Sequence, residues 1–195
     1  MGYGELRNHV LGLTVVCGDG RVLKLGGRVV KNVAGFDLLK SVVGARGRLG
    51  VITSVCVRAF PRPVVDRVLV LRADSAAALV TVARAVGTAP LMPVSSVIIA
   101  PARALSAGAA LLVRLHGGEP TVDADQRTLE RHCGVSFEPE ADGVALLASA
   151  RDHVSVAEAD MVLALSVLPS RIGDALEAVR EVLDDVPVAV GTYKG

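Results

Sequence analysis

Hydrophobic and polar residues alternate in short runs along the first third of the chain. The runs at 13–17 and 21–25 flank Gly18-Asp19-Gly20. An Asp-Gly pair between two such runs predicts a β-hairpin, because the central residues of its tight turn need positive φ. A third run at 50–59 predicts a half-buried strand, since four apolar residues fall on one side of it at period two. Those residues are Val51, Val55, Val57 and Ala59.

Between the hairpin and the third strand, residues 37–43 have helical spacing. Their apolar members share one face, Asp37 precedes them as an N-cap, and Gly44 follows as a C-terminal stop. Pro61 and Pro63 then interrupt the pattern. Because prolines and a change in charge coincide here, we place a domain boundary at 63, which gives domains 1–63 and 64–195.

The second part alternates between strand and helix periodicity. We predict strands at 67–73, 95–100, 109–116, 161–168 and 186–190, and helices at 75–87, 121–133, 143–151 and 170–183. This mixture predicts an α+β fold, without internal repeats.

Composition limits the classes of function. The chain of 195 residues is 51% hydrophobic and 3% aromatic, with no Trp, so its core is expected to consist of Val, Leu and Ala. Few aromatic rings also argue against stacking on single-stranded nucleic acid. Three separated cysteines offer no zinc, iron–sulfur or disulfide framework, and no apolar run reaches about 18–20 residues. We therefore expect a cytoplasmic protein without a membrane span.

Charge is distributed unevenly along the chain. Residues 1–63 contain ten Lys and Arg against three acids, whereas the remainder has eleven bases against seventeen acids. The basic first part either faces an anion or simply presents solvated side chains. Its bases are dispersed over strands and turns and match no recognition helix, so we expect no nucleic-acid role.

Two segments carry a family resemblance. Residues 28–40 (Arg-Val-Val-Lys-Asn-Val-Ala-Gly-Phe-Asp-Leu-Leu-Lys) precede 44–55 (Gly-Ala-Arg-Gly-Arg-Leu-Gly-Val-Ile-Thr-Ser-Val). They resemble the FAD-linked oxidases of the vanillyl-alcohol-oxidase, or PCMH, type, and in particular the FAD-binding E subunit of glycolate oxidase. Residues 3–12 are similar to that family's Arg-Tyr-Gly segment. The resemblance covers 3–63 well and is loose beyond.

The resemblance implies the C-terminal part of a PCMH-type FAD-binding domain, followed by a partial ferredoxin-like α+β substrate (cap) domain. It implies FAD as cofactor, with the adenylate part along Leu49, Gly50, Val51 and Ile52. Tyr3, Gly4, Gly44 and Gly47 are its implied neighbours. Arg48 stands where the family has Thr, and either pairs with a phosphate or points to water.

Glycines suit such a site because a position without Cβ permits positive φ and close approach of a ligand to the backbone. The alternative is that Gly44 and Gly47 only end a helix and open a strand. Lys31 and Asn32 orient a loop or have a purely structural role. His116 is expected to be structural, and His9, His132 and His153 show no ligand-like spacing.

The chain also departs from the family pattern. The family's Gly-rich diphosphate-binding loop lies upstream of the segment that residues 3–12 resemble, so we expect it to be missing here, and the chain to be truncated at both ends. Each lost charge-assisted hydrogen bond would cost about 1–2 kcal/mol of affinity. No His-rich metal motif and no catalytic base can be named, so we expect no metal.

Two functions follow as hypotheses. The first is a FAD-binding oxidoreductase subunit that oxidises a small 2-hydroxy acid such as glycolate, in a complex with flavin and iron–sulfur subunits. The second is a non-catalytic assembly fragment that does not bind FAD alone and is completed by another chain through an exposed sheet edge.

Overall fold

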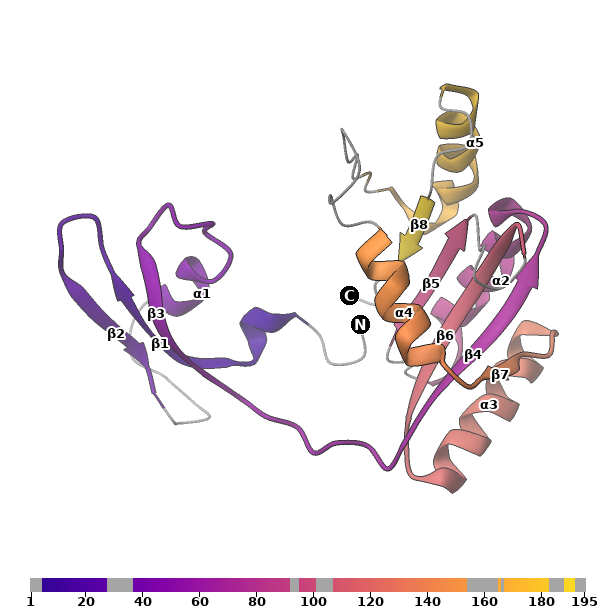
Figure 1. Ribbon diagram of the computed structural model, residues 1–195, viewed down its shortest axis with the longest axis horizontal. Helices are drawn as coiled ribbons and strands as arrows, with labels where there is room; N and C mark the ends of the chain where they lie inside the picture. Colours follow the sequence, from indigo (N-terminus) through magenta and orange to yellow (C-terminus); the bar gives the residue numbers. More distant parts are fainter. Residues whose placement is uncertain are drawn as a thin grey trace. The chain divides into compact units, whose positions relative to one another are not determined.

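The computed structural model describes residues 5–27, 37–91, 95–100, 107–153, 165, 167–182 and 188–191. The chain divides into two compact units between Arg62 and Pro63, next to the predicted boundary. Figure 1 shows the helices and strands of each unit. Among the described residues, no helix is both long enough and apolar enough to cross a membrane.

The N-terminal unit contains a three-stranded antiparallel sheet in the order β2-β1-β3. A 3-10 turn (η1, Leu6–Asn8) precedes β1 (Val10–Val16), which lies between β2 (Val22–Gly26) and β3 (Val51–Val57). β1 and β2 form the predicted hairpin. Of its turn residues only Gly20 has positive φ, at 82°. Positive φ was expected at both central positions, but the connection runs from Cys17 to Arg21 and is longer than a two-residue turn.

Helix α1 (Leu38–Val42) covers part of this sheet. As predicted, Asp37 caps it, accepting a hydrogen bond from the Lys40 amide at 3.4 Å. Its Leu39 packs in a small core with Val10, Leu13 and Val15 of β1. The helix lies against β1 and β2. The prediction that β3 is half-buried is therefore wrong, since all of its residues except Cys56 are exposed.

The C-terminal unit is built on a five-stranded antiparallel sheet in the order β7-β4-β6-β5-β8. Its strands are β4 (Val65–Ala73), β5 (Ser95–Ala100), β6 (Ala109–Gly117), β7 (Glu138–Glu140) and β8 (Val188–Gly191). In the central strand β6, Leu111, Leu112 and Val113 are fully buried. Consecutive buried residues mean that both faces of this strand are covered.

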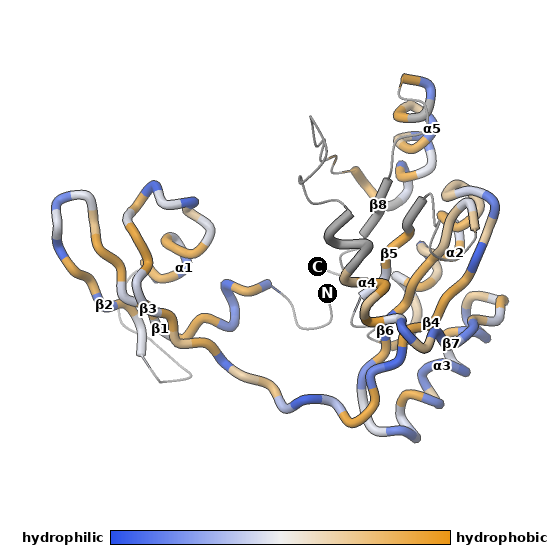
Figure 2. The backbone as a smooth tube through the Cα atoms, in the orientation of Figure 1, coloured by the Kyte–Doolittle hydropathy of each residue, from blue (hydrophilic) through white to orange (hydrophobic). Residues whose placement is uncertain are grey.

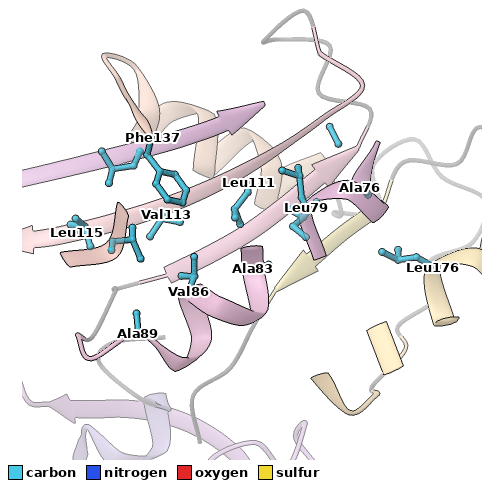
Figure 3. Close-up of a cluster of buried hydrophobic side chains, with 14 of the residues drawn as sticks. Ala76, Leu79, Ala83, Val86, Ala89, Leu111, Val113, Leu115, Phe137 and Leu176 are labelled. Carbon is cyan, nitrogen blue, oxygen red and sulfur yellow. The ribbon is translucent and has the colours of Figure 1, made fainter. Parts of the chain in front are cut away.

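Helices cover the two faces unequally. Residues of α2 (Ala76–Thr88), α3 (Glu119–Cys133) and α5 (Ile172–Val182) belong to the larger core, and a 3-10 turn (η3, Pro169–Arg171) leads into α5. Figure 3 shows Leu79, Ala83 and Val86 of α2 beside alternate residues of β6. The other face packs against Leu146 and Leu147 of α4 (Gly143–His153). Successive strand residues point to opposite faces, so β4 and β6 supply both cores, and Figure 2 shows their middle parts as hydrophobic.

Most predicted elements of this unit are confirmed, and the helix ends follow the expected signals. α2 begins after Ser75, whose side chain accepts a hydrogen bond from the Ala78 amide, and α3 ends at Gly134 with φ 68°. Strand β7 was not predicted, because Glu-Pro-Glu has no apolar pattern. The strand predicted at 161–168 lies mostly outside the described residues, and residues 165, 167 and 168 are not in a strand.

Candidate functional site

The turn from Gly44 to Gly50 joins α1 to β3 and contains most of the predicted cofactor residues. Four of its residues have positive φ: Gly44 at 92°, Arg46 at 52°, Gly47 at 78° and Gly50 at 140°. The turn is held together by its own backbone, since the amide of Arg48 donates to the carbonyl of Ala45 at 3.0 Å. Positive φ is the conformation that glycine adopts without cost, so the glycines are explained by the path of the chain.

The surroundings of the three glycines differ. Among the described residues, no atom lies within 4 Å of the position that a Cβ would take at Gly44 or Gly47. A Cβ on Gly50 would instead collide with the carbonyl of Val16 and lie 2.8 Å from Cγ2 of Val15. Gly50 therefore allows β3 to approach its own neighbour β1, whereas Gly44 and Gly47 leave open space for a ligand.

The exposed surface of this turn is basic and apolar. Arg46 and Arg48 are exposed and take part in none of the ion pairs found among the described residues. Beside them, Leu49 is 50% exposed and Val51 is 67% exposed. Apolar side chains rarely stay this open without a partner molecule when several lie together.

Six predicted site residues are consecutive in the sequence, and the structure places them in the turn and the first two residues of β3. They are Gly47, Arg48, Leu49, Gly50, Val51 and Ile52, and Gly44 begins the same turn. Tyr3 and Gly4 lie outside the described residues, as do Lys31 and Asn32. Arg46 was not among the predicted site residues. A non-glycine residue at positive φ is not visible in a sequence, but its exposed guanidinium beside Arg48 belongs to the same surface.

A second polar cluster lies in the C-terminal unit. On adjacent strands β4 and β6, Asp66 accepts two hydrogen bonds from Arg114, at 2.7 and 2.5 Å, and lies 2.9 Å from Nε2 of His116. The hydrogen bond from Arg114 is the main cause that lowers the pKa of the Asp66 carboxyl, against the opposing effect of burial. The cluster links the two strands at one end of their ladder, and His116 takes part in it.

Metal ligands do not gather in the part of the chain that the structure describes. No group of three or more His, Cys, Asp or Glu side chains is placed there to hold an ion. The three cysteines are free, and burial raises the pKa of the Cys133 thiol.

Comparison with known proteins gives the family context. No family model matches the chain. Glycolate oxidase subunit GlcD of Bacillus subtilis (strain 168) is 26% identical over an alignment of 214 residues. The alignment covers 98% of this chain and 46% of that protein. D-lactate dehydrogenase of Archaeoglobus fulgidus is 47% identical over 60 residues, 31% of this chain and 14% of the relative. Glycolate oxidase subunit GlcE of Escherichia coli (strain K12) is also 47% identical over 60 residues, 31% of this chain and 17% of the relative.

The relatives of this chain are FAD-linked oxidases. This confirms the resemblance seen in the sequence. Among solved structures, alkyldihydroxyacetonephosphate synthase matches with a TM-score of 0.65 at 14% identity, over 92% of this chain and 41% of that one. The fold is thus an α+β fold similar to that of a PCMH-type FAD-binding enzyme, and the chain spans less than half the length of each of these proteins.

Proposed function

We propose that this chain is a FAD-binding oxidoreductase subunit of the glycolate-oxidase type, which takes part in oxidising a small 2-hydroxy acid within a multi-subunit complex. Two kinds of relative support the substrate class, since one is named glycolate oxidase and another D-lactate dehydrogenase. The single observation that carries the proposal is the composition of the Gly44–Ile52 segment. It combines glycines with open space beside the backbone, exposed arginines and exposed apolar residues.

This segment fits the adenylate half of FAD. The cofactor supplies the redox chemistry, by accepting a hydride from the substrate when it is bound. On this proposal Arg46 and Arg48 pair with phosphate oxygens, and the side chains of Leu49 and Val51 form an apolar surface for the adenine. Within the described residues, no backbone hydrogen bond is donated by the amides of Gly44, Arg46 and Gly47, so they remain available to an anion.

The partners and location extend the same proposal. Glycolate oxidase subunits GlcD and GlcE are both relatives, and we propose a complex with further flavin and iron–sulfur subunits in the cytoplasm. The residues of this chain would hold and orient the adenylate end of the cofactor, which would supply the oxidising chemistry.

The test is a binding assay with FAD, ADP and FMN on the purified chain. An adenylate site binds FAD and ADP, whereas FMN, which lacks the adenylate, does not compete. Reversing both charges, with Arg46→Glu and Arg48→Glu, should weaken FAD binding by at least about tenfold, because charge-assisted bonds to phosphate are lost. Arg84→Glu, an exposed arginine of α2, is the matched control and should leave affinity unchanged. Binding of FMN as tightly as FAD, or no effect of the paired reversal, would refute the site.

A second candidate function is a non-catalytic assembly fragment that does not bind FAD by itself. The exposed apolar residues of β3 favour it, because an uncovered strand suits association with another chain. Adding candidate flavin subunits to the FAD assay separates the two functions. Under the second, FAD is retained only in the mixture, and the Arg46→Glu and Arg48→Glu variants bind the partner less well without any loss of intrinsic flavin affinity.

A further inference from the structure

Strand β3 is an edge strand with unusual composition. It pairs with β1 on one side, and within the described residues no strand pairs with its other side. Its seven residues, Val-Ile-Thr-Ser-Val-Cys-Val, include no charge and no proline. Natural edge strands usually carry one or the other to prevent unwanted pairing. The pairing with β1 shifts register at Thr53 and again between Cys56 and Val57, and it is regular between these two points.

One face of β3 forms an apolar ledge, which we define as Ile52, Val55 and Val57. Each lies directly opposite a buried residue of β1: Ile52 beside Val15, Val55 beside Leu13 and Val57 beside Val10. Residues directly opposite in an antiparallel pair point to the same side of the sheet. The ledge therefore continues the small core of the N-terminal unit, yet Val55 and Val57 remain 48% and 51% exposed.

Charge along the segment that contains β3 has one sign. The 28 residues from Leu38 to Val65 contain five bases and no acid. Arg46 and Arg48 precede β3, and Arg58 and Arg62 follow it. None of these four forms an ion pair among the described residues, although Arg58 lies 5.2 Å from the ring centre of Phe60. An apolar strand is thus flanked by uncompensated positive charge at both ends.

We propose that the edge and ledge of β3 bind an extended segment of a partner protein, in which an apolar stretch is flanked by Asp or Glu. The segment pairs with the free edge as an added strand. Its apolar side chains cover the ledge, and its carboxylates face Arg58 and Arg62 and, when no FAD is bound, also Arg46 and Arg48. The proposal specifies how a partner in the proposed complex docks, and it does not depend on flavin binding by this chain.

Charge decides between this partner and a second copy of the chain. Two β3 strands paired antiparallel would bring Arg46 and Arg48 of one copy toward Arg58 and Arg62 of the other. Like charges placed across an interface oppose association. A segment with acidic ends turns the same charges into attraction, and opposite charge also speeds the encounter at low salt.

The experiment uses the whole chain and two synthetic peptides, Asp-Glu-Val-Thr-Val-Thr-Val-Thr-Val-Glu-Asp and the same peptide with Lys at its four acidic positions. Binding is measured by titration, and amide hydrogen exchange locates the contact. The acidic peptide should bind, and should slow exchange in β3. The Lys peptide should bind at least about tenfold more weakly.

Variants then test each part of the surface. Val55→Lys should weaken binding of the acidic peptide about tenfold. Val22→Lys should not, although Val22 lies on the other edge strand of the same sheet and is exposed as well, at 60% against 48% for Val55. Arg58→Glu with Arg62→Glu should abolish the preference for the acidic peptide, because two positive and two negative charges then flank β3. Exchange spectra of each free variant show whether the sheet is still folded, so loss of binding in a folded Val55→Lys chain counts as support.

Several outcomes would overturn the proposal. Equal binding of the two peptides would refute the charge argument. Protection of β2 in place of β3 would show that the peptide does not bind at the edge of β3. If neither peptide binds at millimolar concentration, β3 is not a docking site for such a segment. If sedimentation shows that the chain alone dimerises and that dimerisation protects β3, the occupant is a second copy. Because no flavin is present, none of these results depends on whether the chain binds FAD.

Discussion

Replacing Gly50 by alanine tests the tightest backbone contact in the N-terminal unit. Gly50 has φ 140° and lies where the turn enters β3. The added methyl would collide with the carbonyl of Val16, and would be 2.8 Å from Val15 Cγ2 and 3.1 Å from the carbonyl carbon of Val16. All three atoms belong to β1, the central strand, so relief requires the start of β3 to move away from it.

Two terms set the expected cost. A residue with a Cβ held in this backbone region is strained by about 1–3 kcal/mol. Moving the start of β3 also breaks ladder hydrogen bonds, each contributing about 1 kcal/mol. With about two bonds lost, Gly50→Ala should destabilise the pairing of β1 and β3 by about 3–5 kcal/mol. This is a large part of the 5–15 kcal/mol that stabilises a typical domain.

Amide hydrogen exchange is the suitable assay, because it reports each strand separately in a chain with two units. Exchange from the inner residues of β1 should accelerate about a hundred- to several thousandfold, while β4 and β6 should be unchanged. Gly47→Ala is the control. It has φ 78° but open space at its Cβ position, so only the strain of about 1–3 kcal/mol applies. Exchange from β1 that is equally fast in Gly50→Ala and Gly47→Ala would refute the contact argument.

Three further predictions concern the C-terminal unit. Gly143→Ala should destabilise it by about 1–3 kcal/mol, measured by denaturant unfolding, because the new Cβ would be 2.9 Å from both Cγ atoms of Val68. Gly87→Ala, inside α2 with open space around it, should instead stabilise it by about 0.5–1 kcal/mol; a loss of stability would contradict that. The pKa of Asp66 is lowered from 3.8, so its contribution is present above pH 3.8 and lost as pH falls through the folded value. The free energy of unfolding of the Asp66→Asn variant should therefore fall less than that of the original chain as the pH is lowered. The same pH dependence in both would count against the ion pairs with Arg114.

The sequence was sufficient for the local structure of both units. The hairpin at 10–26 follows from alternation around an Asp-Gly pair, and α1 from the cap at Asp37. These features depend on neighbours in the chain. What could not be predicted depends on distant contacts, such as the short strand β7, which forms only because Glu138 and Glu140 lie beside Arg72 and the edge of β4.

The candidate site shows the same division. The resemblance identified the turn from Gly44 to Ile52, and the positive φ of Gly44 and Gly47 agrees with their type. It did not separate Gly50, where β1 leaves no room for a side chain, from Gly44 and Gly47, which leave space beside the backbone. That distinction needs the position of β1, which periodicity does not provide.

Burial of β3 is where sequence pattern and structure disagree most, and the disagreement has a physical explanation. Alternating Val residues indicate a strand that has been selected to face an apolar layer. In this chain β1 supplies the next strand and α1 packs mainly against β1 and β2, so Ile52, Val55 and Val57 stay 39%, 48% and 51% exposed among the described residues. The apolar pattern of β3 is then informative about what binds there rather than about its own core, and four arginines around it favour a ligand or partner that carries negative charge.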